Sequence, residues 1–417
     1  MATSLYKVLF VIFVFIHLLF DSVEVLVISS GFLLTLIVFD RRTKLSKSIF
    51  ILLSYLGALT IIGLISSVFY SYELFDRIKD VIYFVKPILL ILLGYLLVKR
   101  IKNTTFVLKA IVYIAFFFAI KHLIVLATAD MNGTVEDLRL RGGANNFIEL
   151  VALVILAAYK KKDAILKYDM RIIMLIIIGA SFMLYLSRTM ILGLVIVLLS
   201  VYGYTKLSRK VVEYASLAFI VFGLFYAYLF TLDLRIDKPG FQNFLFKIRN
   251  SPGEVFSAPK KYDPRNHREI FVHWRGYEAN VALNQMRGNP ANYVIGKGFG
   301  ALVDLGFKAP IGGDDGLRYI PYLHNGYVYV FFKTGAIGLL LYLVLLINIY
   351  RQIYIKTKSK KEKILRSIVS GLGIYFFMAS LVISGMYNLE EISVFCLGIF
   401  YALVQLEAEK NKKEIHE

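Results

Sequence analysis

The sequence is poor in cysteine and in charged residues. Its single cysteine, Cys396, lies within an apolar segment, so no intramolecular disulfide can form and the side chain is expected to be a small buried hydrophobe. Only 18% of the residues are charged, which excludes an ordinary soluble globular protein. The chain also lacks an HExxH motif and a second cysteine, so no spacing in it indicates a zinc site.

Apolar residues are abundant instead. They make up 58% of the 417 positions, and the mean hydropathy is +0.67. Apolar runs of membrane-spanning length recur along the chain, which predicts an all-α, polytopic transmembrane helical bundle. A requirement of roughly twenty apolar residues, with shorter tilted segments allowed, gives about twelve spans. These lie near residues 5–20, 22–39, 49–70, 81–98, 106–126, 144–159, 172–186, 189–204, 211–232, 323–349, 367–386 and 391–406.

Basic residues lie mainly between these runs and give a formal net charge of +19. This placement is typical of membrane topology and of contact with anionic lipid, and it does not indicate nucleic-acid binding. Alternate loops and the C-terminal tail are basic: residues 41–44, 99–102, 160–162, 206–210, 351–366 and 410–413. The positive-inside rule therefore predicts that both termini are cytoplasmic, with the N-terminal run as an uncleaved first span.

Residues 233–322 form one long loop, which the same rule places outside the cytoplasm between two transmembrane parts, 1–232 and 323–417. Its mixture of charge, Gly, Pro and Asn with Trp274 predicts an ordered cap on the outer face, with a helix within Arg268–Arg287. In Gly296–Gly300 we favour a backbone turn over a nucleotide site, because no βαβ unit surrounds the glycines. Asp314-Asp315 is interpreted as a solvated turn, with cation binding as the lesser alternative.

Five cations are expected near the outer ends of their spans, where topology alone would not favour them. Each could reach the headgroups by snorkelling. Their convergence on one level favours an anionic ligand at the outer leaflet. A lipid diphosphate fits, because arginine and lysine bind phosphate oxygens well. The five are Lys86, Lys121, Arg141, Arg188 and Lys333.

Two short polar segments accompany these cations. Leu186-Ser187-Arg188-Thr189 joins two apolar runs almost without a loop. It is either a tight hairpin that exposes Arg188 to water or a site that holds this arginine at the outer mouth of the bundle. Residues 139–146 lead into a helix start, where Asn145 could cap the helix and backbone N–H groups could face an anion. Glu149, one turn further, could pair with one of the cations.

The segment His324-Asn325-Gly326-Tyr327 stands at the start of a long apolar run that also contains Gly335-x-x-Gly338. Ionisable groups are costly at such a boundary, which indicates a function. Histidine ordinarily titrates near neutral pH, so His324 can accept a proton from a sugar hydroxyl. The alternative is an interfacial histidine bonded to the cap. The other histidines make weaker candidates: His17, His122, His267 and His273.

Together these elements resemble the O-antigen polymerase and O-antigen ligase family of membrane glycan transferases. The resemblance covers roughly residues 139–345. The elements that carry it are Arg141 with Gly142 and Asn145, Leu186-Ser187-Arg188, Arg268 with Trp274, Gly296-x-Gly298-x-Gly300, His324-Asn325 and Gly335-x-x-Gly338.

This resemblance implies metal-independent, inverting glycosyl transfer at the outer face of the bacterial cytoplasmic membrane, without a cofactor. The donor would be an oligosaccharide on undecaprenyl diphosphate. By analogy Arg188 and Arg268 hold the diphosphate leaving group and His324 assists the acceptor hydroxyl, although Arg265 or Arg275 could take the place of Arg268. Further substrate-binding candidates are Arg141, Asn145, Asn325, Lys333, Lys86, Lys121 and Arg275.

Three functions remain open at this point. A polymerase that builds an O-antigen or capsule from repeat units is favoured, because the loop is moderate and no soluble domain is appended. A ligase that transfers the glycan to lipid A core or another acceptor shares the same motifs. A transporter or flippase would need polar residues through the midplane, and here the unusual charges gather at the outer level. Expected partners are the bilayer, a chain-length regulator and a flippase.

Overall fold

The computed structural model describes residues 3–20, 22–40, 45–128, 143, 146–160, 164–234, 241–256, 273–309, 316–357, 359–389 and 392–416. Every apolar run expected to span a membrane overlaps a helix in these ranges. The helices are α1 (Thr3–Leu19), α2 (Val23–Asp40), α3 (Lys47–Ser67), α4 (Leu74–Ile101), α5 (Thr104–Thr128), α7 (Asn146–Ala158), α8 (Tyr168–Leu184), α9 (Arg188–Val201), α10 (Arg209–Leu229), α15 (Gly326–Tyr350), α16 (Lys360–Ala379) and α17 (Ser393–His416).

Five of the described helices are long and apolar enough to cross a membrane, namely α2, α3, α4, α5 and α15 continued to Tyr354. Shorter apolar helices are α1, α7, α9 and the second half of α10. The architecture is therefore that of a helical membrane protein. The number of spans and the sidedness of the loop and termini stay predictions.

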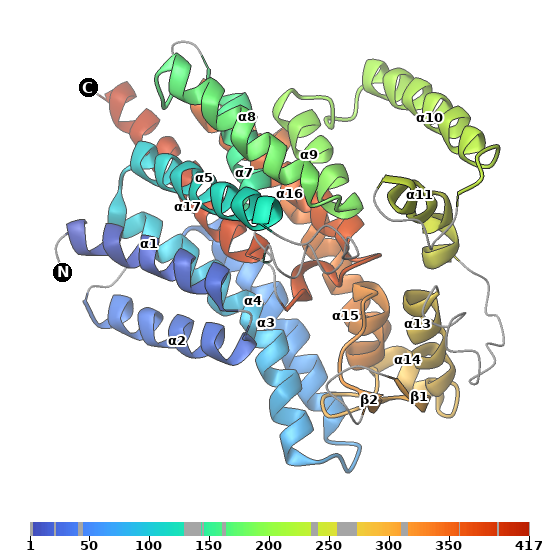
Figure 1. Cartoon of the computed structure of the whole chain (residues 1–417). Coiled ribbons are helices and arrows are strands. Elements are labelled where there is room, and N and C mark those ends of the chain that lie inside the picture. Colours follow the sequence, from blue (N-terminus) through green and yellow to red (C-terminus); the bar gives the residue numbers. More distant parts are fainter. Residues whose placement is uncertain are drawn as a thin grey trace.

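Helix α4 lies in the middle of the bundle and packs along α17 (Figure 1). Small residues permit this close approach. A Cβ on Gly94 would lie 2.5 Å from the carbonyl oxygen of Phe395, and one on Gly398 would lie 2.2 Å from that of Ile91. Glycine at such contacts lets helix backbones pack tightly in membranes, where the hydrophobic effect does not drive helices together.

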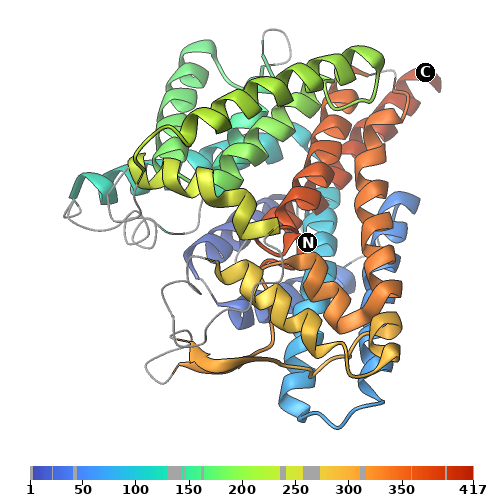
Figure 2. The same ribbon diagram turned by 90° about the vertical axis from the view of Figure 1, so that its right-hand side faces the viewer.

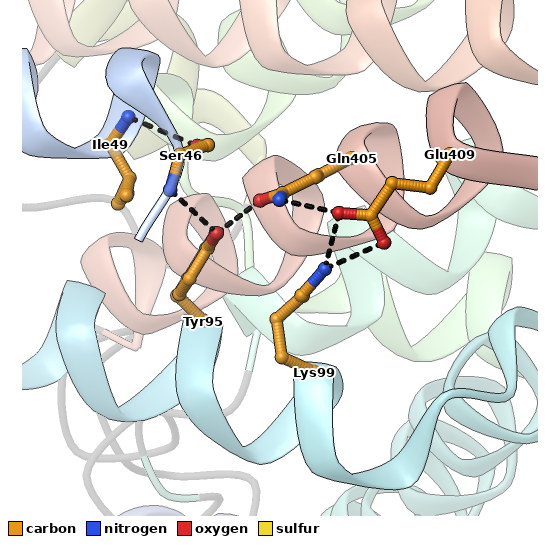
Figure 3. Close-up of polar contacts among 6 residues, drawn as sticks. All are labelled: Ser46, Ile49, Tyr95, Lys99, Gln405 and Glu409. Atoms are coloured by element: carbon orange, nitrogen blue, oxygen red, sulfur yellow. Dashed lines mark hydrogen bonds and ion pairs between the residues drawn. The ribbon is translucent and has the colours of Figure 1, made fainter. Parts of the chain in front are cut away.

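A polar network joins α4 and α17 to the start of α3 (Figure 3). The Tyr95 hydroxyl donates to Gln405 and accepts from the backbone N–H of Ser46, 3.0 Å away. Gln405 donates to Glu409 at 2.6 Å, and Lys99 Nζ lies 2.8 Å from the same carboxylate. Ser46 also caps α3 by accepting from Ile49 N. This network fixes the relative positions of three helix ends.

A small cap gathers beside the first turns of α15 (Figures 1 and 2). It consists of α11 (Phe241–Phe256), α13 (Trp274–Gln285), α14 (Pro290–Ile295), β1 (Val303–Ala309) and β2 (Leu317–Ile320). Helix α13 lies within the predicted helical segment 268–287.

The strands β1 and β2 form a short antiparallel hairpin, a small addition to a structure that is otherwise helical and consistent with the all-α expectation. The sequence carried the signal, because apolar residues alternate with other residues along β1: Val303, Leu305, Phe307 and Ala309. Tyr277 of α13 fastens the hairpin to the cap helix by donating its hydroxyl to Leu305 O. Burial raises the pKa of Tyr277, which keeps this hydroxyl protonated as a donor.

Candidate functional site

His324 is paired with a buried carboxylate of the cap. Its Nδ1 lies 2.8 Å from Oε2 of Glu278 on α13, and the same oxygen accepts from the backbone N–H of His324. The Glu278 side chain is 3% exposed and that of His324 is 42% exposed. The pair therefore has a sealed end and an open end, and the imidazole is at the open one.

This pairing assigns a tautomer to the imidazole. A carboxylate that accepts from Nδ1 requires a proton on that nitrogen, so Nε2 is left as the acceptor. A neutral imidazole of this tautomer can take a proton at Nε2. The carboxylate that accepts from Nδ1 then stabilises the positive charge of the imidazolium. The arrangement is that of a general base.

The backbone around His324 is fastened to the end of α16. The carbonyl of His324 accepts from Ser384 N at 2.6 Å, and Gly326 N donates to Ser380 O at 2.7 Å. Asn325 caps α15 by accepting from Val328 N. A Cβ at Gly326 would lie 2.7 Å from Ser384 O, so this position needs glycine. These hydrogen bonds hold the backbone of His324 in place. Asn325 contributes by capping the helix that begins directly after it.

Arg188 opens α9 after Leu186, which adopts a left-handed φ of 48°. Its Nη1 donates to the backbone oxygen of Lys247 on α11. Helix α11 packs against α13, the helix that carries Glu278. A series of contacts thus leads from Arg188 through α11 and α13 to His324.

Lys333 is placed differently from the expectation. It is fully enclosed, pairs with Asp80 of α4 and donates to Ala301 O at 2.6 Å. Asp80 also accepts from Gly300 N at 2.6 Å. A buried lysine with a carboxylate partner is already neutralised, so the described contacts of this cation join the cap to the bundle.

The glycine-rich turn 296–300 completes that junction. All three glycines have positive φ, between 78° and 93°, which a residue with a side chain rarely adopts. Lys297 N donates to Phe332 O and Gly298 N to Lys333 O, and both of those carbonyls belong to α15 just before its kink at Gly335. A bent helix leaves carbonyls without helical partners, and the turn supplies replacements. The predicted turn is confirmed, and it packs against helices.

The remaining described candidates have different surroundings. Lys86 is almost completely buried, and its ammonium group donates to the backbone oxygens of Asn388 and Leu389. Its described contacts are therefore with the protein itself. Lys121 lies 5.8 Å from the ring centroid of Phe118. Arg275 stands one turn before Glu278 on α13, at the i,i+3 spacing that brings side chains together.

Several predicted residues fall outside the described ranges: Arg141, Asn145, Arg265, Arg268, His267 and Asp314-Asp315. Their roles stay predictions. Among described residues, no group of three His, Cys, Asp or Glu side chains could hold a metal ion.

Glu149 does not pair with a described cation, contrary to one expectation. Its carboxylate accepts from Ser181 Oγ at 2.8 Å, and that hydroxyl lies 2.9 Å from His122 Nδ1. All three side chains are buried between α5, α7 and α8. His122 therefore belongs to an internal polar chain, apart from the His324 pair.

The motifs did not reveal Glu278 and Asp80, the carboxylate partners of His324 and Lys333. Glu278 lies 46 positions from His324, and Asp80 lies 253 positions from Lys333. The only available signals were an acid inside the predicted cap helix and an acid directly before an apolar run.

The fold and site define a helical membrane protein whose cap supports a histidine–carboxylate pair. A family model described as O-antigen ligase matches residues 173–343, from α8 into α15, and so includes Arg188, Glu278 and His324. Over these residues the chain is similar to the O-antigen ligase family, in agreement with the resemblance of its motifs. This similarity supports an enzyme that transfers glycans in the manner of an O-antigen ligase or polymerase. No curated protein matches the chain.

Proposed function

We propose that this protein polymerises oligosaccharide repeat units carried on undecaprenyl diphosphate into a surface polysaccharide, at the outer face of a bacterial cytoplasmic membrane. The observation that supports this most strongly is the pairing of His324 with Glu278, within the stretch that matches the family. The half-exposed imidazole is suited to take a proton from an acceptor hydroxyl. A chain-length regulator and a flippase are the expected partners.

The proposed reaction is a single displacement that inverts the anomeric carbon. A hydroxyl oxygen of one lipid-linked repeat unit attacks the anomeric carbon of another glycan, and the bond from that carbon to the diphosphate oxygen breaks. The hydroxyl proton moves to His324 Nε2, and the lipid diphosphate leaves with the bonding electrons. Glu278 stays ionised and stabilises the imidazolium that forms.

Cations would stabilise the charge that develops on the leaving diphosphate. Arg188 is the described residue proposed for this role, and Arg268 is proposed with it by analogy. A guanidinium has five N–H donors, so the contact of Arg188 with Lys247 O is compatible with binding phosphate oxygens. We further propose Arg275 beside Glu278 as a substrate-binding residue.

The proposal can be tested with full-length protein in proteoliposomes and purified lipid-diphosphate-linked repeat unit as the sole substrate. Wild-type protein should give a ladder of products. His324→Ala should lower the rate by about 10²-fold or more, the contribution typical of a general base. Arg188→Ala should also lower it. Lys308→Ala, an exposed cation on the cap hairpin, is the matched control and should retain the wild-type rate. Full activity of His324→Ala would contradict the proposal.

A ligase is the second candidate, favoured by the description of the matching family model. It would use the same donor and the same base but transfer the glycan to a lipid A core or another acceptor. The same proteoliposomes distinguish the two functions. A product that forms only after lipid A core is added identifies a ligase, whereas a ladder from the repeat unit alone identifies a polymerase.

A further inference from the structure

An open apolar groove lies between α1 and α5. These two helices stand on the side of the bundle away from the cap (Figure 1). It has a volume of about 400 Å³ and is lined almost wholly by apolar atoms. Its walls include Val11 and Phe15 from α1 and Phe106, Tyr113 and Phe117 from α5. Phe15 and Phe117 close one end, where their ring centroids are 5.4 Å apart.

Two lysines mark the opposite end of this groove. Lys109 is part of the wall, and Lys7 Nζ lies 5.0 Å from the centroid of the Phe106 ring. No carboxylate in the described part of the chain forms an ion pair with either lysine. The nearby carboxylate of Asp40 accepts from the Tyr6 hydroxyl. The groove therefore combines apolar walls with two positive charges at one end.

The length of the groove matches one leaflet of a bilayer. Phe106 and Phe117 are eleven residues apart on a single helix, which corresponds to about 17 Å along its axis. Half of the hydrocarbon core of a bilayer is about 15 Å thick. The lysine end is also the basic end of the bundle, because α5 begins directly after the Lys99–Lys102 loop.

We propose that this groove binds an anionic phospholipid. One acyl chain lies between α1 and α5, and the headgroup phosphate bridges Lys7 and Lys109. The charge at the mouth selects for an anionic headgroup, while the apolar wall accepts any saturated or unsaturated chain. The site stands apart from the His324 pair and is independent of the function proposed above.

The test measures lipids bound to the purified full-length protein by native mass spectrometry, with equimolar phosphatidylglycerol and phosphatidylcholine of the same acyl chains. Wild-type protein should prefer phosphatidylglycerol. A Lys7→Gln/Lys109→Gln variant should lower the preference for phosphatidylglycerol about 25-fold, since each lysine near anionic lipid contributes about fivefold. Lys47→Gln, an exposed lysine at the same basic end but outside the groove, should retain it.

A second variant separates the groove from general surface charge. Val11→Phe keeps both lysines but fills the groove. It should therefore lower binding of both lipids while the helical circular dichroism signal stays unchanged. Equal binding of the two lipids to wild type, or an unaltered preference in the double glutamine variant, would overturn the proposal. Displacement of phosphatidylglycerol by polyprenyl diphosphate at equal concentration would also overturn it, because the groove would then belong to the donor.

Discussion

Two acid–base pairs lie at the junction of the cap and the bundle, and they differ in their access to solvent. Asp80 and Lys333 are completely enclosed, and each also bonds a backbone group of the cap segment 300–301. Glu278 is equally enclosed, but its partner His324 is 42% exposed. The enclosed pair has no side on which a substrate could approach, whereas the second pair presents one nitrogen outward.

This difference in exposure suits the two pairs to different roles: the enclosed pair to stabilising the junction, and the half-exposed pair to proton transfer. Two enclosed charges satisfy each other, and removing one leaves the other without a partner in a medium of low dielectric constant. In the half-open pair the acid orients a base that can still exchange protons with a ligand. An intramembrane lysine is thus not by itself a sign of a substrate site, and its partner decides the interpretation.

The largest expected effect comes from breaking the enclosed pair. Lys333→Met leaves the Asp80 carboxylate buried and unpaired, and should lower the free energy of unfolding by about 3–5 kcal/mol. The measurement is denaturant unfolding in detergent micelles, together with the yield of monodisperse protein.

The matched control removes both charges. Asp80→Asn/Lys333→Met should recover most of the lost stability and retain glycan transfer, because neither charge acts on substrate. A stable double variant that is inactive would restore Lys333 to the substrate-binding residues. A single variant as stable as wild type would show that the pair does not support the junction.

The kink beside Lys333 should have the next largest effect. Gly335 has a φ of 66°, and a Cβ there would lie 2.3 Å from Val294 O. Gly335→Ala should therefore cost about 1–3 kcal/mol from backbone strain alone. Gly57 in the middle of α3 has no atom within 4 Å of an added Cβ, so Gly57→Ala should be neutral or slightly stabilising. Equal unfolding midpoints for the two variants would refute this role of the kink.

Altering the half-open pair should affect rate more than stability. Glu278→Gln keeps the shape and an acceptor oxygen for His324 Nδ1, but it removes the charge that stabilises the imidazolium. We expect kcat to fall about tenfold, with KM and the unfolding midpoint unchanged. Steady-state kinetics on the lipid-linked substrate measure this. Wild-type kcat in the variant would mean that Glu278 only fastens the cap.

The exposed ion pair of the hairpin should give the smallest effect. The hydrogen bond from Arg318 lowers the pKa of Asp304 below its ordinary value. A lowered folded-state pKa stabilises the hairpin above the unfolded value of about 3.9, and this contribution is lost as the pH falls below it. Protection of β1 and β2 from hydrogen exchange, corrected for the intrinsic rate, should therefore drop on acidification. Arg318→Ala should reduce that dependence, since only the bond from Gly306 N then lowers the pKa of Asp304, and an unreduced dependence would assign it to another group.

The helices were predictable from the sequence because a bilayer admits few structures. An apolar run must satisfy its own backbone hydrogen bonds, so each run forms a helix whatever its neighbours are. The position of His324 at a helix start was predictable for a similar reason, since Asn325 is a good cap. The turn at 296–300 followed from its glycines.

The partners of the charged residues were not predictable. Lys333 could have faced lipid, substrate or a carboxylate, and only the tertiary structure shows that it contacts Asp80 of α4. Glu278 was one acid within a polar loop, and nothing local connects it to a histidine 46 positions away. The kink at Gly335 likewise depends on the turn that packs against it. Contacts between distant segments need the tertiary structure.

The pairing of Asp80 with Lys333 also constrains how the chain is made. The two residues are 253 positions apart, so at ribosomal rates of about 5–20 residues per second α4 enters the membrane about 13–50 s before its partner exists. An ionised carboxylate within an inserting helix is costly over that interval. Final docking of α4 must therefore wait for α15, which makes assembly of this junction a late step in biogenesis.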